Sequence, residues 1–146
     1  MKQTMEQAVE AITKSVPDAE VRICRRAEVG VTVLHQGDVY LAAVPKGWPR
    51  GKRLGTRQVA VGTTVGSRHV AEGDGVAVFE GKQLPPGFTL PEGARIEDML
   101  GPVIVGDGSV CTLTHPEHAH HRMPTDECDW QVTYQWDPAF AARVRD

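Results

Sequence analysis

The sequence predicts a mainly β fold of the α+β class, either a compact antiparallel β-barrel or a β-sandwich, with an N-terminal helix and a short C-terminal helix. The 15 glycines and 10 prolines among 146 residues are typical of many turns between short elements. Strand-like segments follow one another without regular helices between them, and no Gly-rich phosphate loop occurs, which argues against a nucleotide-binding fold. The length is typical of one domain spanning 1–146.

An amphipathic N-terminal helix is expected over 1–17. Apolar residues recur there at helical spacing and form one stripe: Met5, Ala8, Val9, Ile12 and Val16. Pro17 ends the pattern because proline disrupts a continuing helix. We expect the stripe to dock on the rest of the chain or on another subunit.

A β-rich core is expected over 20–136. Short segments rich in β-branched and aromatic residues, separated by turn residues, are typical of strands. They cover 20–25, 30–34, 38–44, 57–61, 69–71, 75–80, 102–105, 109–113 and 129–136. Gly106-Asp107-Gly108 predicts a hairpin between 102–105 and 109–113. Residues 95–100 predict one helical turn, and 138–146 predict the C-terminal helix.

Charge and cysteine content restrict the partners and the compartment. Sixteen Lys and Arg against nineteen Asp and Glu give a net charge of -3, which argues against nucleic acid as the partner. No stretch approaches the roughly 18 to 20 apolar residues of a membrane span. The odd number of cysteines, the absence of a CxxC pair and the polar N-terminus favour a reducing cytoplasm, with the thiols buried in the core.

A basic segment over 45–55 is expected to be a loop. It combines glycine and proline with four cations: Lys46, Arg50, Lys52 and Arg53. A solvated loop is the simpler interpretation, and contact with an anion is the functional one. We take Arg50, Lys52, Arg53 and also Arg68 as candidate ligand-binding residues.

The main functional candidate is a histidine cluster. Four of the six histidines fall within seven consecutive residues: His115, His118, His120 and His121. Thr114 and Glu117 fit a capping box that would begin a helical turn, and the spacing of His115 and His118 would then place both rings on one face.

These two rings could hold a divalent metal ion, zinc first, with His69 as the preferred third ligand. Four residues near the strand over 129–136 are alternatives to His69: Asp126, Glu127, Cys128 and Asp129. The simpler interpretation is a capping turn whose histidines satisfy neighbouring backbone groups.

Three motifs resemble, in order and spacing, those of a group of small uncharacterised proteins from bacteria and their phages. They are Gln36-Gly37-Asp38-Val39, the GHxH-like Val65-Gly66-Ser67-Arg68-His69, and Leu113-Thr114-His115-Pro116-Glu117-His118. The resemblance covers about 36–146 and implies a shared fold and a shared histidine-bearing site. In the second motif, the first histidine of the group is replaced here.

Three functions are compatible with these residues, so enzymatic activity is left open. The first is a small binding protein whose histidines hold a metal ion or an anionic small molecule, for example as an accessory factor in a phage or host-defence setting. The second is a hydrolase acting on a phosphodiester. In a metal-dependent form, the histidines would bind a divalent ion and Glu117 or Asp126 would act as base. In a metal-free form, His115 and His118 would act directly as acid and base. The third is a structural protein that forms homo-oligomers.

Overall fold

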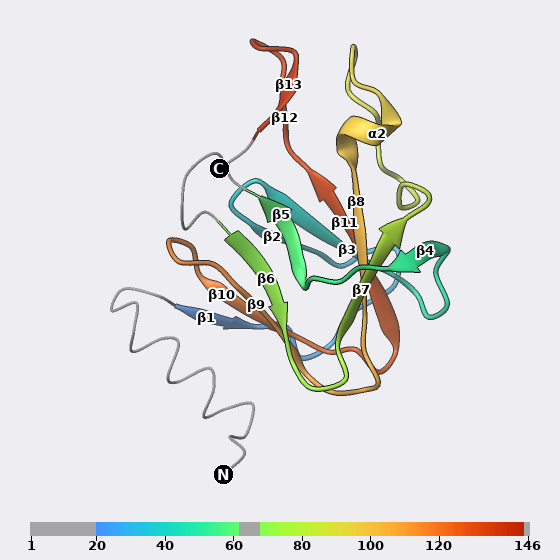
Figure 1. Ribbon diagram of the computed structural model, residues 1–146, viewed down its shortest axis with the longest axis vertical. Helices are drawn as coiled ribbons and strands as arrows, with labels where there is room; N and C mark the ends of the chain where they lie inside the picture. Colours follow the sequence, from blue (N-terminus) through green and yellow to red (C-terminus); the bar gives the residue numbers. More distant parts are fainter. Residues whose placement is uncertain (1–19, 62–67, 145–146) are drawn as a thin grey trace.

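The computed structural model describes residues 20–61 and 68–144, which form two sheets packed face to face as a β-sandwich (Figure 1). Helix is almost absent from these residues and is represented by α2 (Ile96–Met99), where one helical turn was predicted. No described helix has the length and apolar character that crossing a membrane requires. The helix predicted over 1–17 lies outside the described residues.

The first sheet has five strands in the order β1-β10-β9-β6-β5. Its strands are β1 (Val21–Ile23), β5 (Gln58–Val61), β6 (Arg68–Glu72), β9 (Cys111–Thr114) and β10 (His120–Met123). All neighbours are antiparallel except β1 and β10, which run parallel. β10 lies within the histidine-rich segment, where the sequence analysis expects no strand.

The second sheet has six antiparallel strands in the order β2-β3-β11-β8-β7-β4. Its strands are β2 (Val33–Gln36), β3 (Val39–Pro45), β4 (Arg50–Arg53), β7 (Ala77–Gly81), β8 (Leu100–Val105) and β11 (Cys128–Tyr134). β11 lies between β3 and β8, and all seven of its residues are buried.

The core lies between the two sheets. From β11, Trp130 and Val132 meet residues of the other sheet such as Leu113 and Ala71, and all four are fully buried. Side chains alternate between the two faces of a strand, so the apolar residues predicted at every second position of 129–136 become one wall of this core.

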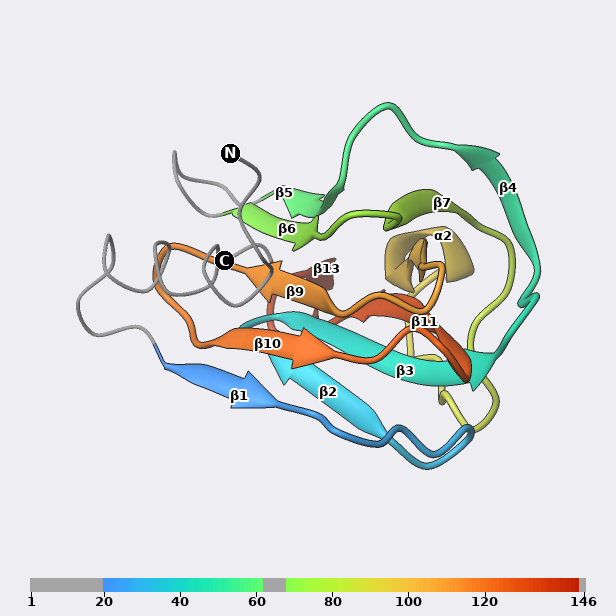
Figure 2. The same cartoon turned by 90° about the horizontal axis from the view of Figure 1, so that it is seen from below.

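Two connections and the start of β6 lie at one end of the sandwich and position the candidate site (Figure 2). The β2–β3 hairpin turns at Gly37, whose φ of 57° is readily adopted by glycine. The β9–β10 connection spans 115–119, and β6 begins at Arg68. Figure 2 shows the start of β6, the β9–β10 connection and the β2–β3 turn at the same end of the molecule.

Of the two architectures predicted, the sandwich is confirmed and the closed barrel is wrong for the described residues. Each sheet keeps two edge strands, β1 and β5 in one and β2 and β4 in the other. A closed barrel has no such edges, because its first and last strands pair.

The predicted C-terminal helix is also wrong over 138–144. β12 (Trp136–Asp137) pairs there with β13 (Ala142–Arg143) in a two-stranded sheet. Asp137 Oδ1 accepts the backbone N–H of Ala139 at 2.9 Å, so the chain turns back immediately after Pro138. The turn does not continue as a helix, because Ala141 has a left-handed φ of 45° and the N–H of Val144 donates to the Gln135 carbonyl at 2.7 Å.

Two further local predictions are wrong. Gly106-Asp107-Gly108 does not form a hairpin, because β8 belongs to the six-stranded sheet and β9 to the five-stranded one. The segment passes from one layer to the other instead. The basic segment 45–55 is not wholly a loop, since it contains β4, which pairs with β7.

Candidate functional site

The three imidazoles predicted to form one site lie together. His69 is the second residue of β6, and His115 and His118 lie in the β9–β10 connection. The ring centroids of His69 and His115 are 4.4 Å apart, those of His115 and His118 also 4.4 Å, and those of His69 and His118 6.3 Å. His69 and His115 are each 1% exposed, whereas His118 is half-buried. We call these three residues the histidine cluster.

The His69 ring is held by the β2–β3 hairpin. Its Nδ1 lies 2.9 Å from Gln36 Oε1 and its Nε2 lies 3.2 Å from Asp38 Oδ1. Gln36 Nε2 donates to the carbonyl oxygens of Leu113 and Ala119 at 3.0 and 2.7 Å. Because the amide nitrogen of Gln36 faces two acceptors, its oxygen is the group that accepts from His69.

His69 therefore carries a hydrogen on Nδ1. When Asp38 is ionised, Nε2 also donates, and the ring is an imidazolium cation in a buried ion pair. Gln36 and Asp38 are 1% and 3% exposed, so this pair is formed away from water, where charge-assisted hydrogen bonds are strongest.

His115 is held in the opposite protonation state. The backbone N–H of Glu117 donates to His115 Nδ1 at 2.9 Å, so that nitrogen has no hydrogen and the ring is neutral with its hydrogen on Nε2. This contact replaces the predicted capping box, in which Thr114 would accept from Glu117. Residues 115–119 form a bend and no helical turn, and the Thr114 hydroxyl instead donates to the Val70 carbonyl at 3.4 Å.

The hydrogen bonds of His69 and His115 determine which of their ring nitrogens could bind the predicted zinc ion. A histidine ligand binds a metal ion through a ring nitrogen without a hydrogen. Both nitrogens of His69 are in contact with protein side chains, and the bare nitrogen of His115 accepts a backbone N–H. Within 20–61 and 68–144, no three or more His, Cys, Asp or Glu side chains are grouped so that they could hold a metal ion.

The histidine cluster adjoins a pocket of about 250 Å³ at the side where β1 and β2 face each other. Its walls include Arg22, His35, His118 and His121, with the hairpin residues of β2–β3 between them. The pKa of His121 is lowered from its ordinary 6.5 by burial and by the nearby Arg22 and His35. Figure 2 shows β1 and β2 side by side along this edge.

The predicted basic residues lie elsewhere. Arg50, Lys52 and Arg53 belong to β4, the edge of the six-stranded sheet opposite to β2. The Arg68 side chain is exposed at the start of β6, and strand alternation directs it away from the face that holds His69. The structure thus does not bring these four cations to the histidine cluster.

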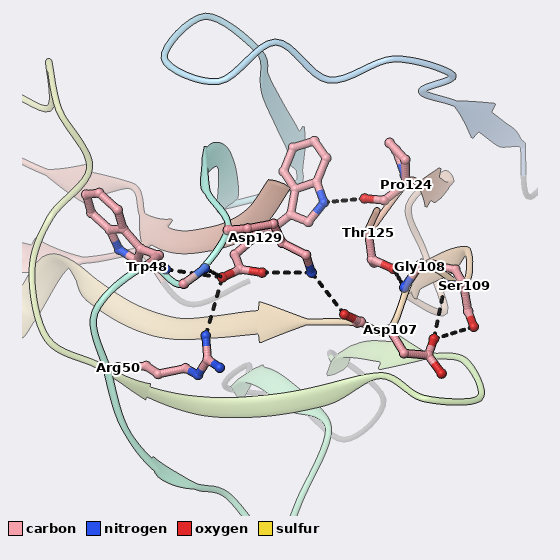
Figure 3. Close-up of polar contacts among 12 residues, drawn as sticks. Trp48, Arg50, Asp107, Gly108, Ser109, Pro124, Thr125 and Asp129 are labelled. Carbon is pink, nitrogen blue, oxygen red and sulfur yellow. Dashed lines mark hydrogen bonds and ion pairs between the residues drawn. The ribbon is translucent and has the colours of Figure 1, made fainter. Parts of the chain in front are cut away.

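Arg50 instead contributes to a second polar cluster centred on Asp129 (Figure 3). The carboxylate of Asp129 is fully buried and accepts from Lys46 Nζ at 3.2 Å and from Arg50 Nη1 at 3.3 Å. It also accepts from the backbone N–H groups of Gly47 and Trp48 at 2.9 and 3.3 Å. We call these five residues the Asp129 cluster. Two of the four donors are side chains of the basic segment and two are its backbone N–H groups.

The alternative third ligands also lie at a distance from the cluster. Asp126, Glu127, Cys128 and Asp129 follow the C-terminal end of β10, whereas His118 precedes its N-terminal end. Glu117 is exposed on the loop between His115 and His118, so its predicted role as a base stays a prediction.

Sequence reasoning missed the two residues that hold His69. Gln36 and Asp38 belong to the Gln36-Gly37-Asp38-Val39 motif, which carried the family resemblance but was interpreted only as a turn and the start of a strand. All three motifs of the resemblance contribute residues to one site, and this convergence is the pattern that could have revealed Gln36 and Asp38.

No protein-family model, curated protein or solved structure matches this chain. The resemblance to the bacterial and phage group thus stays a prediction, and function must be argued from the geometry of the site.

Proposed function

We propose that this chain is a small binding protein that holds an anionic ligand at the histidine cluster. The supporting observations are that the neutral His115 carries its ring hydrogen on Nε2 and that His118 connects the buried rings to the pocket. A group of N–H donors at the edge of a pocket suits an acceptor with negative charge.

An anion fits these contacts better than a metal ion does. Zinc bound at His115 Nε2 would require the ring hydrogen to move to Nδ1, and the contact with the Glu117 N–H would be lost. Zinc bound at His69 would require the ring to release Gln36 or Asp38. An anion requires neither change, because it can accept a hydrogen bond from His115 Nε2 or from His118 while His69 keeps both of its partners.

Calorimetric titration tests this proposal with inorganic phosphate and with zinc chloride as separate probes, at pH 6.5 in a zwitterionic buffer. We expect wild-type protein to bind phosphate and His118→Ala to weaken that binding at least tenfold, about 1.4 kcal/mol. Gln83→Ala, which changes an exposed side chain in the loop after β7, is the matched control and should bind like wild type. Phosphate binding that survives His118→Ala, or zinc binding without phosphate binding, would overturn the proposal.

A second candidate is a metal-free hydrolase of phosphodiesters. It is favoured by the place of His118, an imidazole that lines the pocket beside the two buried rings, because acid–base catalysis needs a ring within reach of the substrate. His118 would take a proton from the attacking water and then return it to the leaving oxygen, because both nitrogens of His69 and the bare nitrogen of His115 are held by other groups of the protein.

Turnover of bis(p-nitrophenyl) phosphate, measured with and without EDTA, tests the hydrolase. Activity that persists in EDTA and is lost in His118→Ala supports metal-free acid–base catalysis. Activity that EDTA abolishes supports the metal-dependent hydrolase. Phosphate binding without turnover leaves the binding protein as the function.

A further inference from the structure

The pocket beside the histidine cluster is lined by one arginine and three histidines that the sequence analysis did not combine into a site. Arg22 comes from β1, His35 from β2, His118 from the β9–β10 connection and His121 from β10. Among the described residues, no Asp or Glu lines this pocket. Four side chains that are cationic or able to become so therefore surround one hollow without a carboxylate in its wall.

The β1–β10 pairing brings two of these side chains together. Arg22 and His121 are direct partners in the parallel register of the two strands. Arg22 has a carboxylate neighbour in Glu20, but the closest N–O distance is 3.7 Å and the two side chains are 58% and 72% exposed. An exposed pair at this distance contributes little, so the guanidinium can turn toward a ligand at small cost.

His121 lies deeper in the same pocket and is 6% exposed. Burial lowers the pKa of His121 most strongly, and the charges of Arg22, His35 and His120 lower it further, whereas a hydrogen bond with the His35 backbone raises it. These groups come from β1, β2 and β10 itself, and none of them is acidic. An anion in the pocket would supply the negative charge that this arrangement of like charges lacks.

We infer that this pocket binds the phosphoryl group of a phosphate or phosphate monoester, with Arg22 and His121 as the principal contacts and His35 and His118 on its other sides. This inference rests on the proposed anion-binding function and names the class of ligand and the residues that recognise it.

A phosphoryl group suits the pocket better than a carboxylate for two reasons. Its three terminal oxygens accept hydrogen bonds from several directions, whereas a carboxylate has two oxygens in one plane. The donors converge from three strands and a loop, and the guanidinium of arginine matches phosphate with two parallel N–H groups. The volume of about 250 Å³ is below the range of about 300 to 1,000 Å³ for drug-sized ligands, so a compact group is expected.

Binding measurements on full-length Arg22→Gln test the inference, with inorganic phosphate, phenyl phosphate and benzoate as the probes. Arg25→Gln is the matched control, because Arg25 is an exposed arginine three residues away that does not line the pocket. We expect Arg22→Gln to raise the Kd for phosphate and phenyl phosphate at least tenfold, Arg25→Gln to change it less than twofold, and benzoate to bind wild type more weakly than phenyl phosphate.

The variant Arg22→Lys separates the guanidinium geometry from its charge. Lysine keeps the positive charge but lacks the two parallel donors, so it should recover only part of the lost affinity. The comparison of inorganic phosphate with phenyl phosphate shows which source of the group is preferred, and either preference agrees with the inference.

Failure of this inference differs from failure of the proposed function. Phosphate binding that needs His118 but is unchanged in Arg22→Gln overturns the pocket assignment and leaves the anion-binding function standing. Benzoate that binds as tightly as phenyl phosphate overturns the phosphoryl class. Absence of any anion binding to wild-type protein overturns both.

Discussion

The two buried carboxylates, Asp38 and Asp129, have partners of different kinds. Asp129 accepts from Lys46, from Arg50 and from backbone N–H groups (Figure 3), whose charges and donors do not change near neutral pH. Asp38 faces His69, a side chain of the type that gains or loses its charge in that range. Asp129 is thus held by permanent cations and backbone donors, whereas Asp38 is held by an imidazole.

The surroundings of the two carboxylates also differ: one fixes a chain segment onto a strand, and the other adjoins a pocket. The Asp129 cluster ties the 45–50 segment onto β11, and Arg50 also stacks over the Phe79 ring at 4.8 Å. The Asp38–His69 pair adjoins two more imidazoles and, through His118, a pocket. A buried carboxylate whose hydrogen bonds come from permanent cations and backbone groups is typical of a structural role. A buried carboxylate that is paired with an imidazole beside a pocket is more typical of a functional site.

The largest effect on folding should come from Asp129→Asn. The substitution removes the charge that holds Lys46, Arg50 and two backbone N–H groups, and we expect a loss of about 2–4 kcal/mol in the free energy of unfolding. This is less than for a fully buried pair, because both cations are about one-third exposed and can return to water. Urea unfolding measures the loss, with the exposed Asp126→Asn as control. Equal stability of the two variants would contradict a structural role for the cluster.

Asp38→Asn should cost less, about 1–2 kcal/mol. The asparagine amide can donate to His69 Nε2 once the ring has lost that hydrogen, so the hydrogen bond survives and only the charge disappears. NMR measurement of the ring nitrogens of His69 checks this at pH 6.5. We expect two protonated nitrogens in wild type and one in the variant, and an unchanged spectrum would show that Asp38 does not set the charge of His69.

Stability should fall on acidification, because the folded protein lowers the pKa of His120 and His121 below their ordinary value of 6.5, through burial in both and also through Arg22 beside His121. The unfolded chain then binds more protons than the folded one, so this stability is present above about pH 6.5 and is lost as pH falls toward the folded pKa values. Each group contributes at most about 1.4 kcal/mol per pH unit.

Urea midpoints between pH 7.5 and 5.5 measure this dependence, and His120→Leu tests its source. His120 is 1% exposed and neither ring nitrogen has a hydrogen-bond partner in the part of the chain that the structure describes. Leucine removes the titrating group, so we expect a flatter pH dependence with little loss at pH 7.5. A slope equal to that of wild type would assign the dependence to other groups.

The smallest effect concerns the three thiols, which belong to neither cluster. They should react with a thiol reagent at different rates. Burial raises the pKa of Cys111 to about 12 and that of Cys128 to about 11, whereas Cys24 is only half-buried and its pKa is raised less. A thiol reagent at pH 8 should therefore modify one cysteine quickly and the other two only on unfolding. Fast modification of all three would contradict the burial of Cys111 and Cys128.

Several elements could be predicted because their patterns are local. Alternation of apolar residues over 129–136 indicated the strand β11, and Gln36-Gly37-Asp38 indicated the turn between β2 and β3. β10 was missed because His120 and His121 do not resemble strand residues, and it forms because β9 and β1 pair with it on either side. Tertiary pairing here overrides weak local propensity.

The histidine cluster was predicted in its members and missed in its contacts. Crowding of histidines over 115–121 and the isolated His69 were visible in the chain, and the three rings do meet. Nothing local indicated that Gln36 and Asp38 would hold His69, or that the basic residues would bind Asp129 at the other side of the sheet. Such pairings join residues 31 to 83 positions apart, and only the packing of the sheets brings them together.

The amino-acid sequence by itself determined the β-rich class, most of the turns and the identity of the clustered histidines, because these depend on side-chain type and on periodicity over a few residues. The order of the strands, the layer to which each belongs and the hydrogen bonds of each imidazole were decided only by the tertiary structure. Burial is the reason, since a ring nitrogen removed from water must bond to whichever group the facing sheet presents.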